Sequence, residues 1–249
     1  MTAARRLLRG RRVSVAGVRR LDEGDPARVA VLVPAAGVGE RMGGARKPFL
    51  EVAGRSVLDW ALAGFLERDD VVEVVVALGG GGDPGGIAGR DPRIRVVQGG
   101  DSRFGSVANA FGRAESPATV IAVHDAARPF PPRAVIDACI RLAASGCGAV
   151  AGIGAVDTVK RTDADGRIVE TPARDALWYA QTPQVFPREL FARGVAHCRA
   201  AGIAPTDDAA MVEQLGEEVR MVPSSATNLK ITRPEDLVVA EGYLEQGLV

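Results

Sequence analysis

The chain has 249 residues, of which 47% are hydrophobic, so it can bury a full core within one large domain. Its formal charge is zero, but residues 1–20 hold seven arginines and no acid, which leaves the rest of the chain mildly acidic. That balance argues against broad nucleic-acid binding, and no run approaches the roughly 20 apolar residues that would cross a membrane.

The arginine-rich residues 1–25 are interpreted as a disordered N-terminal extension, followed by a single domain over residues 26–249. An organellar transit peptide is the alternative, because such peptides are rich in arginine and poor in acids. The three cysteines lack CxxC spacing, so they indicate neither a disulfide framework nor a zinc site, and a reducing compartment fits them. We therefore expect a cytoplasmic bacterial protein in preference to one imported into a plastid.

Short runs rich in Val, Ile and Ala, separated by helical patterns, predict the fold; they cover residues 29–34, 71–78, 93–98, 118–124 and 148–153. Continuous apolar runs of this length are typical of strands that are buried on both faces. They predict an α/β fold with a Rossmann-like, mostly parallel central sheet and flanking helices. Ser56 and Asp59 form a capping box for the first helix, and further helices are expected over 132–145 and 188–201. The glycine-rich residues 79–89 predict a mobile loop.

Between Asp157 and Arg174, polar and apolar residues alternate around a turn at Asp163–Gly166. This is the pattern of a β-hairpin, and both of its faces are too polar for the main core. We predict a protruding β-arm over about residues 155–176, which needs another chain to pack against.

The first apolar run opens into a loop of small residues that ends with Arg41, Arg46 and Lys47. Such a loop can hold a polyphosphate against exposed backbone N–H groups. It is not a dinucleotide fingerprint, because Met42 takes the place of the third glycine, and the chain has no Gly-Lys-Ser/Thr triplet of a P-loop. The loop therefore indicates phosphate binding, with a solvated basic loop as the alternative.

A second glycine-rich segment follows the run at 93–98. Here Asp101, Arg103 and Ser106 offer an acceptor, a cation and a hydroxyl group. In open parallel sheets, ligands bind at the carboxyl ends of the strands, which is where this segment is expected to lie.

A third candidate segment follows the run at 118–124 and contains Asp125 and Arg128. These two side chains either bind a ligand at the strand end or simply pair with each other. We interpret His124, at the end of the strand itself, as a structural hydrogen-bonding residue and not as a base.

Towards the C-terminus, strand alternation would point Lys230 away from the apolar residues on either side of it. Thr232 and Glu235 have the spacing of a capping box for the last helix. Asp207 and Asp208 are interpreted as an N-cap and a first-turn acid, placed where the helix dipole favours negative charge.

Six motifs, in order and at suitable spacing between about Val29 and Leu244, resemble those of the 2-C-methyl-D-erythritol 4-phosphate cytidylyltransferase family. They are Pro34–Met42, Gly99–Arg103 with Ser106–Val107, His124–Pro129, Gln181–Phe186, Thr206–Ala209 and Lys230–Asp236. The resemblance implies transfer of the cytidylyl group of CTP to 2-C-methyl-D-erythritol 4-phosphate, with release of pyrophosphate. It also implies Mg²⁺, with no ligands assigned, and a homodimer joined through the β-arm. Charge balance and hydropathy, as above, argue against a nucleic-acid or membrane partner.

The same resemblance assigns residues to the site, motif by motif. Cations on the phosphates of CTP and around the erythritol phosphate would carry catalysis: Arg41, Lys47, Arg174 and Lys230. The nucleotide would be held by Pro34, Ala35, Ala36, Gly37, Gly39, Gly100, Asp101, Arg103 and Ser106. The acceptor would be held by Asp125, Arg128, Thr158 and Thr182. Since Thr158 and Arg174 lie on the arm, they would serve the neighbouring subunit's site.

The chain departs from the family's pattern at Arg46-Lys47-Pro48, where the family usually has Pro-Lys. The chemistry needs no protein nucleophile, because a phosphate oxygen is already ionised near neutral pH, so positioning and fixed charge suffice.

A ribitol 5-phosphate cytidylyltransferase is a near alternative with similar motifs. A nicotinamide-dependent oxidoreductase and a non-catalytic CTP-binding regulator are alternatives from other classes.

Overall fold

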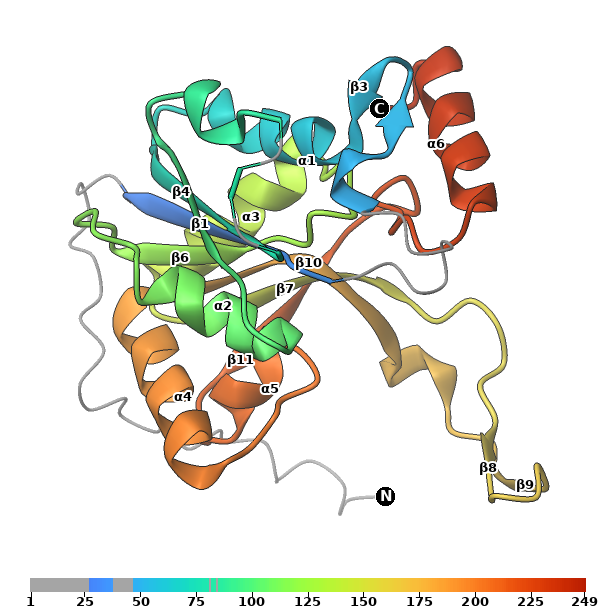
Figure 1. Ribbon diagram of the computed structural model, residues 1–249. Helices are drawn as coiled ribbons and strands as arrows, with labels where there is room; N and C mark the ends of the chain where they lie inside the picture. Colours follow the sequence, from blue (N-terminus) through green and yellow to red (C-terminus); the bar gives the residue numbers. More distant parts are fainter. Residues whose placement is uncertain (1–26, 38–46, 81, 84) are drawn as a thin grey trace.

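The computed structural model describes residues 27–37, 47–80, 82–83 and 85–249 (Figure 1). The predicted N-terminal extension lies outside these residues. The core of the fold is a seven-stranded sheet with the order β11-β7-β10-β6-β1-β4-β5. Its strands are β1 (Val29–Ala35), β4 (Val71–Leu78), β5 (Ile94–Gln98), β6 (Val120–Val123), β7 (Gly148–Gly154), β10 (Trp178–Pro187) and β11 (Val219–Pro223). All neighbouring pairs are parallel except those made by β10, so the predicted mostly parallel α/β fold is confirmed.

Helices cover both faces of the sheet (Figure 1). On one face lie α1 (Val57–Leu66) and α3 (Arg133–Ala144), and on the other α2 (Arg103–Phe111), α4 (Arg188–Ala201) and α5 (Asp208–Glu213). Alternate residues of β1 belong to the two cores: Val31 packs with α1 and α3, whereas Leu32 packs with α2 and α4. Two-sided burial therefore explains why the strands read as continuous apolar runs.

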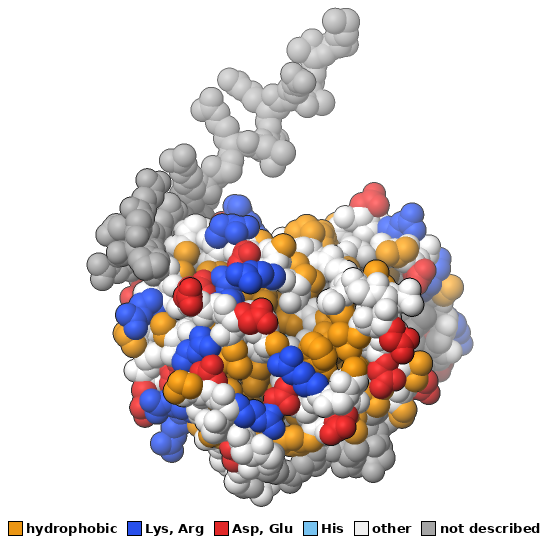
Figure 2. Space-filling model, turned by 90° about the horizontal axis from the view of Figure 1, so that it is seen from above, with side chains coloured by type: hydrophobic (Ala, Val, Ile, Leu, Met, Phe, Trp, Pro, Cys, Tyr) orange, Lys and Arg blue, Asp and Glu red, His pale blue; other side chains and the backbone are white. Residues whose placement is uncertain are grey.

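A third, smaller core joins the C-terminal helix α6 (Glu235–Glu245) to the hairpin of β2 (Glu51–Val52) and β3 (Arg55–Ser56). Over the face that Figure 2 shows, Lys and Arg side chains lie interspersed with Asp and Glu side chains. In the described part of the chain, no helix is both long enough and apolar enough to span a membrane.

The capping predictions had different outcomes. The first box is confirmed, because the Ser56 hydroxyl accepts a hydrogen bond from the backbone N–H of Asp59 at 3.1 Å and donates one to its carboxylate at 2.6 Å. The box predicted for α6 is wrong in its acid: the carboxylate of Asp236, not that of Glu235, accepts from the N–H groups of Thr232 and Arg233. The carboxylate one residue further along is the one that turns back over the helix start.

Two further predictions concern segments outside the main sheet. Residues around Lys230 form no strand, although the N–H of Ile231 donates to the carbonyl of Ala127 at 2.8 Å and its side chain is buried. The loop predicted over 79–89 contains a short 3-10 helix, η3 (Ile87–Gly89), and the carboxylate of Asp83 accepts from the N–H groups of Ile87 and Ala88.

The predicted β-arm is present as an antiparallel hairpin of β8 (Arg161–Thr162) and β9 (Ile168–Glu170). Its turn is closed by the backbone N–H of Asp163, which donates to the carbonyl of Arg167 at 3.0 Å. A short 3-10 helix, η4 (Arg174–Ala176), leads from the hairpin into β10. The arm extends well away from the body of the molecule (Figure 1).

Candidate active site

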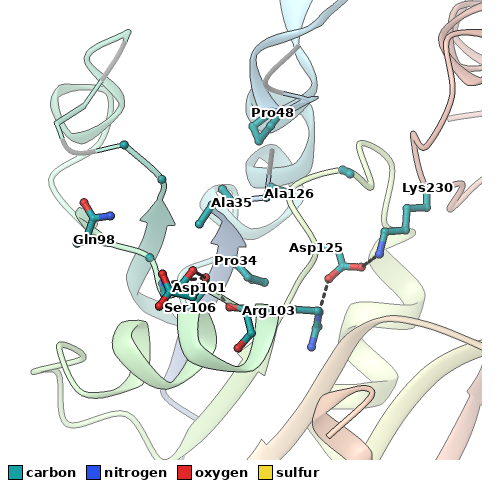
Figure 3. Close-up of a pocket in the computed structure, with 18 residues that line it drawn as sticks. Pro34, Ala35, Pro48, Gln98, Asp101, Arg103, Ser106, Asp125, Ala126 and Lys230 are labelled. Carbon is teal, nitrogen blue, oxygen red and sulfur yellow. Dashed lines mark hydrogen bonds and ion pairs between the residues drawn. The ribbon is translucent and has the colours of Figure 1, made fainter. Parts of the chain in front are cut away.

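A cavity of about 480 Å³ opens where β1, β4, β5 and β6 end. Because these strands are parallel, their carboxyl ends meet at one edge of the sheet, and the loops that follow them line the cavity (Figure 3). The lining includes most of the predicted nucleotide-binding residues together with two residues predicted for the acceptor side, Asp125 and Lys230. The nucleotide-binding residues among them are Pro34, Ala35, Ala36, Gly37, Gly100, Asp101, Arg103 and Ser106.

Part of the cavity wall is bare backbone, because glycine lets the strand-end loops approach each other closely. A Cβ atom on Gly99 would lie 2.3 Å from the Cβ of Ala36, and one on Gly100 would lie 2.7 Å from the carbonyl carbon of Gly105. The Ser106 hydroxyl accepts from the N–H of Gly100 at 3.1 Å and so fixes the loop against α2. The arrangement suits a ligand that binds to main-chain groups.

On the other side of the cavity, charged side chains of alternating sign form an ion-pair network. Lys230 Nζ lies 2.6 Å from one carboxylate oxygen of Asp125, and Arg103 Nε lies 3.1 Å from the other (Figure 3). The second arm of the Arg103 guanidinium lies 2.7 Å from the carboxylate of Asp208. The two acids are buried, with 10% and 2% of their side chains exposed, whereas Lys230 is 42% exposed to the cavity and solvent.

The pKa values of these groups follow from that packing. Burial by itself would raise the pKa of Asp125, but the positive charges of Arg103 and Lys230 outweigh it and hold this pKa well below its usual value. Burial raises the pKa of Asp208, and its contact with Arg103 offsets only part of that effect. Burial would lower the pKa of Arg103, but the two carboxylates raise it, so the guanidinium stays charged.

His124 is structural, as predicted. Its ring is fully buried; Nε2–H donates to the carbonyl of Arg128 at 2.9 Å, and Nδ1 accepts from the Thr182 hydroxyl at 3.0 Å. That hydroxyl in turn accepts from the N–H of Asp125 at 3.0 Å. Burial lowers the pKa of His124 to about 4, so the neutral ring holds the loop that carries Asp125.

One of the two interpretations of Asp125 and Arg128 is wrong, because these side chains do not pair with each other. Asp125 is paired with Arg103 and Lys230, whereas the guanidinium of Arg128 donates to the carbonyl of Asn228 at 2.6 Å. Arg128 is buried and does not line the cavity. The hydroxyl of Thr182, also buried, is engaged by His124 and Asp125.

The remaining predicted residues lie either outside the described part of the chain or on the arm. Gly39, Arg41 and Arg46 lie outside the described residues, as does the side chain of Lys47. On the arm, Thr158 is exposed, and the guanidinium of Arg174 donates to the carbonyl of Val156 at 2.7 Å. Neither of these two arm residues lines this chain's cavity.

Some residues of the site were not predicted from the sequence. Gly79, Gly80 and Gln98 line the cavity and directly follow or end strands that were predicted, so their position was the available signal. Asp208 was interpreted only as a first-turn acid; its ion pair with Arg103 had no local signal, because 105 residues separate the two.

Comparison with known proteins identifies the same family as the sequence motifs. The family model of 2-C-methyl-D-erythritol 4-phosphate cytidylyltransferase matches residues 29–246. A protein of that name from Aeromonas hydrophila is 41% identical over 222 residues, covering 88% of this chain and 90% of the relative. One from Deinococcus radiodurans is 42% identical over 227 residues, covering 88% and 92%.

Solved structures agree with these relatives. The crystal structure of 2-C-methyl-D-erythritol 4-phosphate cytidylyltransferase from Thermus thermophilus superposes with a TM-score of 0.74 at 36% identity, covering 88% of this chain and 99% of that one. A 4-diphosphocytidyl-2C-methyl-D-erythritol synthase from Anaerococcus prevotii gives a TM-score of 0.78 at 27% identity, covering 88% and 97%. Sequence and fold thus match over nearly the same span, and the chain belongs to the 2-C-methyl-D-erythritol 4-phosphate cytidylyltransferase family.

Proposed function

We propose that this chain transfers the cytidylyl group of CTP to 2-C-methyl-D-erythritol 4-phosphate, giving 4-diphosphocytidyl-2-C-methyl-D-erythritol and pyrophosphate. One observation carries the proposal. In this member of the family, a cavity at the carboxyl ends of parallel strands has exposed main chain on one side and the ion-pair network of Lys230, Asp125 and Arg103 on the other. The relatives described above are named for methylerythritol phosphate, which favours that acceptor over ribitol 5-phosphate.

The two walls suggest how the substrates divide the cavity. CTP would bind along the loops after β1 and β5, with its ribose and phosphates against the main chain of residues 34–37 and against Gly100, Asp101 and Ser106. The acceptor would bind at the charged wall, where Asp125 can accept hydrogen bonds from hydroxyl groups and Lys230 can bind the phosphate. Arg128 and Thr182 would support this side from within the fold.

The reaction is a displacement at phosphorus. A phosphate oxygen of the acceptor forms a bond to the α-phosphorus of CTP, the bond from that phosphorus to the bridging oxygen breaks, and pyrophosphate leaves with the electron pair. Both reactants are anions, so fixed cations must offset the charge that accumulates in the transition state. We propose Arg41 and Lys47 for this role, since the sequence places both in the loop after β1.

Mg²⁺ would enter the site bound to the phosphates of CTP and would neutralise part of their charge. Among the described residues, no group of three or more His, Cys, Asp or Glu side chains could hold a metal ion. Of the carboxylates that the structure describes, Asp101 and Asp125 line the cavity, and the second is already bound by two cations. This donor set fits a metal that depends mainly on substrate phosphates, as Mg²⁺ commonly does.

A homodimer joined through the β-arm accounts for the arm's apolar surface. Val156, Ile168 and Val169 are 77%, 61% and 49% exposed, and Trp178 and Tyr179 at the base of the arm are 40% and 50% exposed. Packing against a second copy would bury these side chains and carry Thr158 and Arg174 towards the partner's cavity. Sedimentation of Ile168→Asp, in which charge enters the apolar surface, should report monomers where the parent chain reports dimers.

A pyrophosphate-release assay with CTP, Mg²⁺ and either alditol phosphate tests the main proposal. We expect release with 2-C-methyl-D-erythritol 4-phosphate and a much lower kcat/KM with ribitol 5-phosphate. Lys47→Ala should lower kcat by about 10²- to 10³-fold, as loss of one preorganised donor does elsewhere. Arg174→Ala should instead raise KM for the acceptor. CTP binding without pyrophosphate release would indicate a regulator, and no CTP binding would overturn the proposal.

Because CTP is an intracellular substrate and the relatives are bacterial, we propose that the enzyme is cytoplasmic.

A further inference from the structure

Two adjacent acids at the start of α5 make different contacts. The carboxylate of Asp207 caps the helix, accepting from the N–H of Ala210 at 2.9 Å, and also accepts from the Gln184 amide at 2.9 Å. Asp208, the next residue, lies 2.7 Å from the guanidinium of Arg103 and has only 2% of its side chain exposed. Capping is therefore complete without Asp208, whose ion pair needs another explanation.

Arg103 connects Asp208 to the cavity. It is the first residue of α2, and its guanidinium binds Asp125 through Nε and Asp208 through a terminal nitrogen. Asp125, Arg103 and Lys230 all line the cavity, whereas Asp208 does not. A planar guanidinium held at two edges has little freedom to rotate, so the position of Asp208 constrains where Arg103 presents itself to Asp125.

The charge balance of the ion-pair network also indicates that Asp208 acts on Asp125 through Arg103. Two cations and two anions alternate, so each carboxylate has a cationic neighbour and Asp125 is shared between Arg103 and Lys230. If Asp208 lost its charge, Arg103 would be balanced by Asp125 alone. Asp125 would then be drawn more closely into its pair with Arg103, and its hold on Lys230 and on acceptor hydroxyl groups would weaken.

We propose that Asp208 is a positioning residue for the acceptor side of the cavity: acting through Arg103, it fixes where Asp125 and Lys230 meet the alditol phosphate. This inference rests on the proposed function, because it assigns Asp125 and Lys230 to the acceptor. It also gives Arg103 a supporting role between the two substrates, in addition to its place beside the nucleotide.

The test is the separate measurement of KM for each substrate in Asp208→Asn, which keeps the side chain's shape and removes its charge. We expect KM for 2-C-methyl-D-erythritol 4-phosphate to rise about tenfold, the lower end of what hydrogen-bonded supporting residues contribute at metal sites, with KM for CTP within about twofold of the parent. Asp207→Asn is the matched control, because asparagine also caps helices well; its acceptor KM should not change.

A double-mutant cycle shows whether the effect passes through Arg103. In Arg103→Lys a single ammonium group cannot span both carboxylates, so acceptor KM should already be raised, and adding Asp208→Asn should change it little further. This variant also keeps the proposal testable if Asp208→Asn fails to fold, which circular dichroism would reveal.

Three outcomes would overturn the inference: equal acceptor KM values for Asp207→Asn and Asp208→Asn, additive effects in the cycle, or a rise in KM for CTP alone. Each of these requires a parent enzyme that releases pyrophosphate from CTP and the alditol phosphate. A parent that does not do so would overturn the proposed function itself, which separates the two failures.

Discussion

The cavity and the β-arm both contain arginine–carboxylate pairs, but they hold them in different surroundings. Arg103 and Asp208 lie 2.7 Å apart and the carboxylate is 2% exposed, whereas Arg161 and Glu170 on the arm lie 2.8 Å apart with 66% and 51% of their side chains exposed. Nearly equal distances therefore correspond to different energetics. Water screens the pair on the arm, while the buried pair depends on its partners because neither charge can be solvated alone.

The two regions also differ in what they need from outside. The ion-pair network beside the cavity draws Arg103, Asp125, Asp208 and Lys230 from four segments of the same chain, and neighbouring members contact each other directly. The arm presents Thr158 and the exposed apolar side chains of Val156 and Ile168 to solvent. The cavity can therefore be perturbed within one chain, whereas the arm's contribution depends on the proposed second copy.

The largest effect on stability is expected at Asp125, which lies between two cations of the ion-pair network. Asp125→Asn removes the buried carboxylate shared by Arg103 and Lys230, which leaves Arg103 with Asp208 as its remaining partner and Lys230 to be solvated. We expect the free energy of unfolding to fall by about 3 to 5 kcal/mol, measured by urea denaturation at neutral pH. A loss below about 1 kcal/mol would mean that this cluster behaves like the exposed pairs of the arm.

The free energy of unfolding should depend on pH because His124 is buried in its neutral form. Its pKa is about 4 in the folded chain against 6.5 for the free side chain, so between these values the unfolded state takes up a proton and the folded state does not. Stability contributed by the neutral ring is therefore present above about pH 6.5 and is lost as the pH falls towards 4, by roughly 3 kcal/mol in total. NMR titration should show this ring neutral at pH 5.5; protonation near pH 6.5 would contradict the prediction.

A methyl group at Gly100 should be costly because its Cβ would meet backbone atoms of α2. Gly100→Ala is expected to lower the free energy of unfolding by about 1 to 3 kcal/mol, the range seen for overpacked sites. Gly154→Ala, where β7 leads towards the arm, is the matched control because a Cβ there would have no atom within 4 Å. Thermal unfolding of both variants gives the comparison, and equal losses would show that the loop near Gly100 can move aside.

The smallest effect is expected on the arm itself. Arg161→Gln breaks the exposed pair with Glu170, and the free energy of unfolding should change by less than about 1 kcal/mol. Raising the salt concentration should leave the difference between variant and parent near zero. A loss as large as that of Asp125→Asn would mean that the arm pair is buried in the working protein, as packing against a partner would make it.

Much of the fold followed from local pattern. The runs ending near Val33, Leu78 and Val123 are strands because unbroken apolar residues can be buried on both faces only within a covered sheet. β10 was not predicted, since Pro183 lies within it and proline argues against a central strand. Its antiparallel place between β6 and β7 is a property of the assembled sheet.

For the site, local pattern was enough to identify the glycine loops and the polar residues at the strand ends, because each lies within a few residues of the strand that positions it. How those groups pair depends on the packed fold. Asp125 is bound by Lys230, 105 residues away, and Arg103 by Asp208, also 105 residues away. Ion pairs are set by which segments the packed sheet and helices bring within about 3 Å of each other, and the acids carry no local mark of the cation they will meet.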